Sequence, residues 1–483
     1  MMGKHHIDGE WLASRLGRTR TIINPANGDI IAEVSEGDRG DAKDAITAAR
    51  RAFDSGEWTN STGEERARVL NRIASEIEKN KEELAEFETL DTGKTLRESR
   101  WDMDHVSEVF RYYAKLALES PHEALKAPNP KATSELVREP LGVCAMILPW
   151  NYPLGQAAWK LAPALAAGCT VILKPSEFTP MTTLRLTEIA SSSGLPKGVV
   201  NIVLGSGEKV GAELVENPLV DMVSFTGGSE SAKEIMSAAS GTLKKLTMEL
   251  GGKNPNIIFE DADFDIAIDQ AMNAVFFHAG QICSAGARLL VHEAIHDRFV
   301  ESLVARMRRI KVGPGILPES EMGPLISEVQ RERVESYVAL GIDEGATLLC
   351  GGQRPEGDEA AKGFFFLPTL FSDCESSMRI SQEEIFGPMI TVEKFNTDTE
   401  AIEKANHTIY GLAAGIWTQN RKRIQELTRA LRFGTVWVND YNVFFPAAPW
   451  GGFKQSGLGR ELGRAGIEEY RELKHIYENH APE

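Results

Sequence analysis

The sequence has few cysteines, and none of them forms a recognisable metal or disulfide motif. Five occur among 483 residues, and no two stand in a Cys-X-X-Cys pair. An odd number of widely spaced cysteines supports neither a disulfide framework nor a zinc site. We therefore expect a protein of a reducing compartment, with the cytoplasm as the default location.

Long hydrophobic runs are missing as well. The longest stretch of small apolar residues, Leu161–Leu173, contains Pro163 and Gly168 and is too short to span a bilayer. Residues Met1–Trp11 are polar and lack the apolar centre of a secretory signal. The sequence therefore predicts no membrane segment and no export.

Positive charge is in deficit. Lys and Arg total 53 against 70 Asp and Glu, which gives a formal net charge of −17. A surface this acidic repels phosphate backbones and anionic lipids, so we expect neither nucleic acid nor a membrane as a partner. Hydrophobic residues make up 42% and charged residues 25%, as in a soluble globular protein, and the length predicts two to four domains.

Apolar periodicity indicates two regions in which strands and helices alternate, 142–239 and 256–439. Such alternation predicts a doubly wound parallel sheet, with ligands at the carboxyl ends of its strands. Helical spacing predicts one helix over Arg66–Glu88 and another over Lys209–Val215. The tail, Glu468–Tyr477, is typical of an edge strand. The expected fold is two α/β domains with an appendage.

Three residues have the chemistry of a catalytic site, although each also has an ordinary structural explanation. Cys283 follows an apolar helix and is either a nucleophile or a small buried hydrophobe. Glu249 ends a predicted strand before two glycines and is either a general base or a solvated loop acid. Asn151 precedes a Tyr-Pro pair and is either an amide donor to an oxyanion or a helix N-cap. The residues alone leave these alternatives open.

Two glycine-rich turns and a Lys-Glu pair indicate a nucleotide. Gly205–Gly211 and Phe225–Ser229 each join a predicted strand to a helix, where backbone N–H groups suit a phosphate. The first turn is one residue too long for the Gly-X-Gly-X-X-Gly fingerprint. Lys174 and Glu177 follow a predicted strand and suit the hydroxyls of a ribose, and an acid there disfavours a 2′-phosphate. Each signal also fits a surface turn, but together they favour a nucleotide.

Taken together, these residues resemble the aldehyde dehydrogenase superfamily. The resemblance extends from Asn24-Pro25 to Gly459–Gly463 and covers nearly the whole chain, and the separation between Glu249 and Cys283 also matches. The motifs, all in family order, are Pro149–Pro153, Lys174–Glu177, Phe225–Gly227, Glu249–Lys253, Gly280–Cys283, Glu384–Pro388 and Pro449–Gly452.

The resemblance implies an NAD-dependent oxidation of an aldehyde to a carboxylic acid. Cys283 attacks the carbonyl, the Asn151 amide and the Cys283 N–H hold the oxyanion, and Glu249 activates the water that hydrolyses the thioester. Glu461 matches the position of an auxiliary acid–base group. The implied NAD contacts are Ile147, Pro149, Trp150, Lys174, Ser176, Glu177, Gly207, Gly211, Phe225, Gly227, Ser229, Glu249, Gly251, Glu384 and Phe386.

Two positions indicate which cofactor is bound and how its phosphates are contacted. Glu177 implies a preference for NAD, with NADP as a weaker cosubstrate. Many members carry Ser directly after Phe-Thr-Gly, whereas this sequence has Gly228 there, so a side-chain contact to phosphate is not expected at that position.

The resemblance also implies domain boundaries and assembly. The expected α/β fold has a doubly wound parallel-sheet NAD-binding domain (1–122 and 141–251), a second α/β catalytic domain (252–453) and a small β oligomerisation appendage (123–140 and 467–483). Members are dimers or tetramers, so we expect a homodimer or homotetramer. Some relatives bind potassium, which here implies a K+ site at Ile23 and Asp91.

Aromatic residues flank the catalytic motifs and indicate the substrate. Several aromatic faces around one pocket suit a quaternary ammonium ion through cation–π attraction, although helical aromatics are more often core. Tyr152, Trp159, Phe277 and Trp450 resemble the aromatic box of betaine aldehyde dehydrogenases, and residues 278–286 and 435–452 resemble bacterial members of that group. The predicted reaction converts betaine aldehyde to glycine betaine, an osmolyte. An ω-aminoaldehyde or broad-specificity aldehyde dehydrogenase is the alternative.

Overall fold

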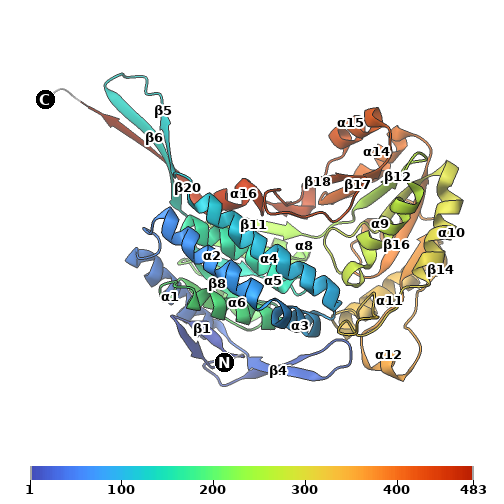
Figure 1. The fold of residues 1–483 in the computed structure, drawn as a ribbon, viewed down its shortest axis with the longest axis horizontal. Helices are drawn as coiled ribbons and strands as arrows, with labels where there is room; N and C mark the ends of the chain where they lie inside the picture. The colour runs from blue at the N-terminus through green and yellow to red at the C-terminus, as the bar shows by residue number, and fades with distance from the viewer. Residues whose placement is uncertain (1–2, 481–483) are drawn as a thin grey trace.

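The chain forms two lobes, each built on a large β-sheet, and a narrow three-stranded extension (Figure 1). The structure, a computed structural model, describes residues 3–480 apart from the side chain of Glu359. Residues 1–2 of the predicted first domain and 481–483 of the predicted oligomerisation segment lie outside the described residues. Among those described, no helix is long and apolar enough to cross a bilayer. The predicted α/β fold with a small β appendage is confirmed.

The first sheet has five parallel strands whose order reverses at its centre. They lie in the order β11-β10-β7-β8-β9, and ligands bind such sheets beyond the strands where the order reverses, here β7 and β10. Antiparallel strands extend both edges. The strands are β7 (Val143–Ile147), β8 (Thr170–Lys174), β9 (Val200–Ile202), β10 (Met222–Gly227) and β11 (Lys245–Leu250), with β19 (Gly457–Leu458) at one edge and β1 (His5–Ile7) and β2 (Glu10–Leu12) at the other.

Helices cover both faces of this sheet, so its strands are apolar on both sides. Along β7, Cys144 and Met146 pack into one core cluster, whereas Val143, Ala145 and Ile147 pack into another. One face carries α2 (Gly63–Lys79), α4 (Leu96–Ala117), α5 (Pro153–Ala167) and α6 (Met181–Ser192), with α3 (Lys81–Thr92) against α4 and α6; the other carries α1 (Arg39–Ser55), α7 (Ala212–Glu216) and α8 (Ser229–Ala239).

Two predicted helices differ from the structure. The single helix over Arg66–Glu88 is wrong, because α2 ends and α3 begins at Asn80. The Asn80 side chain donates to the Glu76 carbonyl at 2.7 Å and so competes with the helical backbone bonds. The helix over Lys209–Val215 is in part a π-helix, η1 (Gly207–Gly211), because the Ser206 carbonyl accepts the N–H groups four and five residues on.

The second sheet is also parallel, except for one edge strand. Its order is β14-β15-β16-β13-β12-β17-β18, with β14 antiparallel; the sequence patterns missed β12, β13 and β15. The strands are β12 (Pro255–Ile258), β13 (Arg288–His292), β14 (Thr347–Cys350), β15 (Thr369–Ser372), β16 (Met389–Phe395), β17 (Ala413–Trp417) and β18 (Thr435–Val438). Its helices are α9 (Phe264–Phe276), α10 (His296–Met307), α11 (Glu328–Asp343), α12 (Asp358–Lys362), α13 (Arg379–Gln382), α14 (Asp398–Asn406) and α15 (Arg421–Ala430).

The extension is a three-stranded antiparallel sheet that projects from the first lobe (Figure 1). It consists of β5 (His122–Leu125), β6 (Ala132–Pro140) and β20 (Arg471–Asn479), and the predicted strand character of the tail is confirmed. The tail strand begins three residues later than predicted, because α16 (Gly463–Glu468) precedes it. Large apolar side chains are exposed on it, namely Leu125, Leu473, Ile476 and Tyr477.

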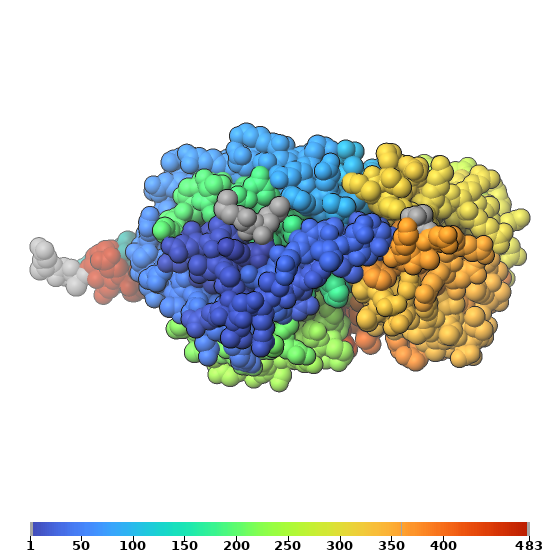
Figure 2. Space-filling view, turned by 90° about the horizontal axis from the view of Figure 1, so that it is seen from below, coloured from blue at the N-terminus to red at the C-terminus, as the bar shows by residue number. Residues whose placement is uncertain are grey.

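An N-terminal hairpin connects the lobes. Figure 2 shows this dark blue segment, which includes β3 (Thr19–Ile23) and β4 (Ile30–Ser35), lying across the first lobe and reaching the orange part of the second. At the contact, the Phe364 N–H donates to the Pro25 carbonyl at 3.0 Å. The hairpin therefore ties together segments that are far apart in the sequence.

A buried ion pair between neighbouring strands stabilises the second sheet, and its contribution can be measured. Arg288 on β13 donates to Glu393 on β16 at 2.7 Å, and both side chains are fully buried. We expect Arg288→Met to lower the free energy of unfolding by about 3–5 kcal/mol, because the Glu393 carboxylate stays buried without its cation. Urea unfolding followed by circular dichroism measures the loss. The double variant Arg288→Met/Glu393→Leu should recover part of it, and no recovery would contradict this origin.

Candidate active site

Cys283 lies where two cavities meet. One, of about 510 Å³, has a largely aromatic wall; the other, of about 270 Å³, lies beside the carboxyl ends of β7, β10 and β11. Cys283 lines both cavities and is the partly exposed cysteine among their lining residues. A group held on this sulfur is accessible from two sides.

A strained turn presents the cysteine. The short helix η2 (Phe277–Gly280) follows α9, and His278, Ala279 and Gly280 all have positive φ, of 48°, 53° and 74°. A Cβ on Gly280 would lie 2.1 Å from the Gly387 carbonyl oxygen, so only glycine fits. Strain of this kind is kept where the surrounding structure fixes it, commonly at functional sites.

Glu249 lies next to the thiol, at the end of β11. Its carboxylate is 3% exposed, receives hydrogen bonds from the Cys283 thiol and, at 3.1 Å, from the Trp450 indole N–H. Burial, and then repulsion by Glu461, raise the pKa of Glu249 to about 8. The alternative of a solvated loop acid is therefore wrong, because this carboxyl is buried.

The thiol is affected by the same surroundings. Burial is the main cause that raises the pKa of Cys283, and the Glu249 carboxylate raises it further. No basic side chain is among the main influences on this sulfur. Thiol and carboxyl thus form a hydrogen-bonded pair, and the charge of the carboxyl affects the pKa of the thiol.

Asn151 connects the end of β7 to the cysteine turn. Its Nδ2 donates to the Gln281 carbonyl at 2.9 Å, and the side chain is buried. The interpretation as a helix cap is wrong, because α5 begins at Pro153 after Tyr152 and has no side-chain cap. The amide therefore binds the chain two residues before the candidate nucleophile Cys283.

Glu461 lies close behind Glu249. Lys160 Nζ contacts Glu461 Oε1 and donates to Thr226 Oγ1 at 2.7 Å, and Glu461 Oε2 has no partner among the described residues. The backbone of Glu461 pairs with that of Trp450, which holds this ion pair beside the Glu249 carboxylate. The structure therefore brings together all four predicted catalytic residues.

Seven of the fifteen predicted cofactor residues line the smaller cavity. Glu384 Oε1 accepts the Gly252 N–H at 3.2 Å, and burial raises the pKa of this carboxyl to about 7. Trp150 and Phe386 meet edge to face with ring centroids 5.2 Å apart. The predicted residues that line this cavity are Pro149, Trp150, Gly227, Glu249, Gly251, Glu384 and Phe386; Ile147 ends β7, Phe225 lies in β10, and Ser229 opens α8.

The remaining predicted cofactor residues gather at the carboxyl end of β8. Lys174 Nζ lies 3.6 Å from the Glu177 carboxylate, which accepts the Gly207 N–H at 2.8 Å. Burial lowers the pKa of Lys174. Ser176 and Glu177 line a small recess with Arg20 and Glu36, and Gly211 in η1 faces the Lys174 side chain.

The larger cavity holds three of the four predicted substrate residues. Tyr152, Trp159 and Phe277 line it, as expected for an aromatic box. Trp450 does not line it, because its ring packs behind Phe444 with centroids 4.9 Å apart and its N–H is engaged by Glu249.

Known proteins are similar to this chain over nearly its whole length. A profile of the aldehyde dehydrogenase family matches residues 11–476. The chain belongs to the aldehyde dehydrogenase family. It is 57% identical to a betaine aldehyde dehydrogenase of Bacillus subtilis (strain 168), over 99% of its own length and 97% of the relative's.

Two further relatives are informative. The chain is 43% identical to a peroxisomal aminoaldehyde dehydrogenase of Pisum sativum, over 97% of its own length and 94% of the relative's. A crystal structure of betaine aldehyde dehydrogenase from Staphylococcus aureus in complex with NAD+ is 50% identical, covers 100% of this chain and 96% of its own, and superposes with a TM-score of 0.99.

Sequence patterns missed an important wall of the substrate cavity of this aldehyde dehydrogenase. Trp101, Asp102 and His105 line it from α4, and Phe444 lines it as well. The 101, 102 and 105 spacing places these three on one helix face, which was the available signal. His105 also accepts the Trp159 indole N–H at 3.0 Å and so fixes that ring.

A buried cation lies beneath the aromatic wall. Lys94 Nζ lies 4.0 Å from the centre of the Tyr152 ring, 2.7 Å from Asp102 and 3.3 Å from Glu88. Burial raises the pKa of Asp102 to about 7. With both carboxyls ionised the group carries a net negative charge next to the cavity, which favours a cationic ligand.

The predicted K+ site involves the Asp91 side chain and the backbone at Ile23. Asp91 in α3 is fully buried; its Oδ2 accepts the Met181 N–H at 2.8 Å, and its Oδ1 has no partner among the described residues. Ile23 ends β3 and is exposed. Within residues 3–480 no three His, Cys, Asp or Glu side chains form a metal-binding group. A cation bound by Asp91 and backbone carbonyls stays a prediction.

The proximity of Glu249 to Cys283 can be tested through thiol reactivity. We expect Glu249→Gln to speed alkylation of Cys283 by iodoacetamide severalfold at pH 9, because the ionised carboxylate raises the pKa of the thiol. Mass spectrometry of the modified peptide gives the rate, with half-buried Cys350 on β14 as an internal reference. Slower alkylation would contradict this expectation and would make Glu249 the base that removes the thiol proton.

Proposed function

We propose that this chain uses NAD to oxidise betaine aldehyde to glycine betaine. The observation that carries the proposal is the position of Cys283 between an aromatic cavity and a cavity at the carboxyl ends of parallel strands. The Bacillus subtilis relative is a betaine aldehyde dehydrogenase, and the Staphylococcus aureus structure holds NAD+. Aldehyde and hydride acceptor would meet at this sulfur.

Carbon–sulfur bond formation begins the reaction. Cys283, as the thiolate, attacks the aldehyde carbon, and the carbonyl oxygen takes the negative charge. The Asn151 amide and the Cys283 backbone N–H are the donors for this oxyanion. NAD, when bound, supplies the acceptor for the hydride, whose loss leaves a thioester on Cys283.

Glu249 is the general base for hydrolysis of the thioester. As the carboxylate it takes a proton from water, the hydroxide attacks the thioester carbon, and the acid leaves as Cys283 returns to the thiolate. Glu461 raises and Lys160 lowers the pKa of Glu249, so this neighbouring ion pair tunes the base. A direct role of Glu461 in moving protons is part of the proposal.

Residues around the carboxyl ends of β7, β8 and β10 fit NAD better than NADP. Glu177 stands beside Lys174 where a ribose would lie, and a carboxylate there repels a 2′-phosphate. Gly228 is exposed and offers no side chain to a phosphate. We propose NAD as the cofactor, with NADP as a weaker cosubstrate.

The charge and shape of the larger cavity support a quaternary ammonium substrate. Trp159, Phe277 and Phe444 offer aromatic faces, and a trimethylammonium group gains from several such faces without needing hydrogen bonds. Asp102 adds a carboxylate to the same wall. The aldehyde would then point from the aromatic faces toward Cys283.

An ω-aminoaldehyde is the second candidate substrate. The specific observation in its favour is Asp102, because a carboxylate can accept hydrogen bonds from a primary ammonium group, which aromatic faces cannot. The pea relative is an aminoaldehyde dehydrogenase.

The three-stranded extension has an exposed apolar edge that suits assembly with another copy of the chain. The outer strand β20 presents exposed Leu473, Ile476 and Tyr477, and apolar side chains on an edge strand favour pairing with another copy. We propose a homodimer or homotetramer formed through this extension, working in the cytoplasm.

A pair of aldehydes of equal shape tests recognition of the cation. Betaine aldehyde and 3,3-dimethylbutanal differ in having nitrogen or carbon at the branch point, so only one is charged. We expect kcat/KM for betaine aldehyde to be at least tenfold higher. Phe277→Leu should raise its KM about 5- to 30-fold, because a ring face over a desolvated cation contributes about 1–2 kcal/mol. NADH absorbance gives the rates.

The neutral aldehyde is the matched control for that substitution. Leucine keeps an apolar wall, so the KM for 3,3-dimethylbutanal should change less than threefold. Equal effects on both aldehydes would contradict a cation-binding box, and a higher kcat/KM for 4-aminobutanal in the wild type would favour the second candidate.

The pH profile tests Glu249 as the hydrolytic base. The rate of thioester hydrolysis should rise from about pH 7 to 9, since a carboxyl with a pKa of about 8 accepts a proton only when ionised. Trp450→Phe removes an N–H donor that favours the carboxylate, so the midpoint should move to higher pH. Stopped-flow measurement of turnover after the NADH burst checks this.

Trp58→Phe is the control, because the buried indole N–H of Trp58 lacks a partner among the described residues. An unmoved midpoint in Trp450→Phe would contradict the assignment.

A further inference from the structure

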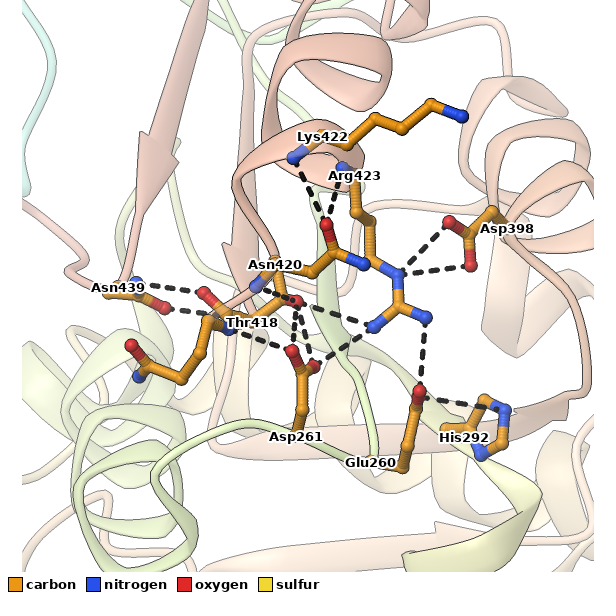
Figure 3. Close-up of polar contacts among 10 residues, drawn as sticks. Glu260, Asp261, His292, Asp398, Thr418, Asn420, Lys422, Arg423 and Asn439 are labelled. Carbon is orange, nitrogen blue, oxygen red and sulfur yellow. Dashed lines mark hydrogen bonds and ion pairs between the residues drawn. The ribbon is translucent and has the colours of Figure 1, made fainter.

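A network of charged side chains lies at the carboxyl edge of the second sheet, outside both cavities (Figure 3). Arg423 of α15 is its centre, and its side chain is 11% exposed. The guanidinium donates to Asp398 at 3.0 Å, to Asp261 at 2.9 Å and to Glu260 at 3.0 Å. It also lies over the Phe259 ring, 4.2 Å from the ring centre. One cation thus joins the end of β12 to the starts of α14 and α15.

Thr418 connects this network to the backbone that follows β17. Its fully buried hydroxyl donates to Asp261 at 2.7 Å and accepts the Asn420 N–H at 3.1 Å and an Arg423 N–H at 3.3 Å. The hydroxyl therefore has no hydrogen-bonding capacity left. The charged network therefore fixes Thr418 through its side chain, and with it the position of the Thr418 backbone.

Asn439 binds to that fixed backbone. Its Oδ1 accepts the Thr418 N–H at 3.1 Å and its Nδ2 donates to the Thr418 carbonyl at 3.0 Å, as Figure 3 shows. The side chain thereby continues the pairing of β17 with β18 one step beyond the end of β18. Asn439 has a φ of +54°, and this left-handed residue turns the chain away from the sheet.

The chain that leaves Asn439 forms a wall of the substrate cavity. We define residues 440–444 as the cavity loop. The Tyr441 hydroxyl donates to the Ser284 carbonyl at 3.0 Å, and the Ser284 hydroxyl donates to Asn442 at 2.8 Å, so the loop is bonded to the residue beside Cys283. Asn442, Val443 and Phe444 line the cavity.

We propose that the Arg423 network positions the cavity loop, and that Asn439 is the positioning residue through which it sets the affinity for the aldehyde. The inference rests on the proposed aldehyde oxidation. Asn439 touches neither cavity, so its effect reaches the substrate through the loop. A merely stabilising role would lower the amount of folded enzyme and leave every KM unchanged.

Asn439→Gly tests the link directly. Glycine keeps the left-handed backbone without strain and removes both hydrogen bonds to Thr418. With the aldehyde that the wild type uses best, we expect the KM for the aldehyde to rise about tenfold, while the KM for NAD and kcat stay within about twofold. Asn439→Asp, which keeps the acceptor for the Thr418 N–H and loses the donor, should give an intermediate KM.

Asp373→Gly is the matched control. Asp373 also has a φ of +54° and follows a strand of the same sheet, β15, but it is exposed and contacts neither the network nor the cavity loop. Its KM values should equal those of the wild type. An equal rise in the KM for aldehyde in this control would assign the effect to backbone freedom and overturn the proposal.

Two further substitutions keep the test decisive if Asn439→Gly does not fold. Thr418→Val keeps the side-chain shape and removes the hydroxyl, and Arg423→Met removes the cation. Both variants should raise the KM for aldehyde and leave the KM for NAD unchanged. Arg423→Lys should retain part of the affinity for aldehyde that Arg423→Met loses. Unchanged KM values, or equal rises for aldehyde and NAD, would overturn the inference. If the wild-type enzyme prefers another aldehyde, the betaine aldehyde assignment is wrong, but the proposed role of Asn439 is not affected.

Discussion

The buried amide of Asn254 binds the segment that connects the two sheets to the second sheet, close to the point where the thiol and the carboxyl meet. Its Nδ2 donates to the carbonyls of Cys283 at 2.8 Å and Ala285 at 3.1 Å, and its Oδ1 accepts the Ala413 N–H at 3.0 Å. The side chain is fully buried, so each of these bonds replaces one that water would otherwise make. Glu249 belongs to one sheet and Cys283 precedes a strand of the other. The short segment between β11 and β12 therefore sets their relative position, and Asn254 fixes that segment.

Burial then gives the paired groups their chemistry. Three carboxyls around the two cavities have a pKa raised by burial toward neutrality, Glu249 to about 8, Asp102 to about 7 and Glu384 to about 7. Each is therefore able to change charge under ordinary conditions, which an exposed carboxyl does not do. A cationic substrate in the larger cavity favours the ionised form of Asp102, since opposite charges attract strongly where water is excluded. The charge of the substrate and the charge of Asp102 are therefore linked.

The sequence was sufficient for the elements with strong local signals. The apolar strands β7, β8 and β10 were predicted because both of their faces are buried, and Cys283, Glu249 and Asn151 stand in short contiguous motifs. The helix break at Asn80 was missed because a polar residue between two amphipathic stretches does not interrupt their period. Asp102 was missed because its place in the cavity depends on how α4 packs against α5, not on its neighbours in sequence. The Arg423 network draws on residues more than 150 positions apart, so no local pattern could reveal it.

Trp450 shows how one side chain can serve both cavities without lining the substrate cavity itself. Its ring packs against Phe444 at 4.9 Å and Trp159 at 6.5 Å, and its N–H donates to Glu249 at 3.1 Å. The aromatic motif was predicted to contact substrate, since sequence proximity does not distinguish a wall from the layer behind it. In this position a shift of Phe444 would displace the indole, and with it the N–H donor that favours the Glu249 carboxylate. The shape of the substrate cavity and the pKa of Glu249 are consequently linked, and a change that enlarges the cavity through Phe444 would also change the protonation of Glu249.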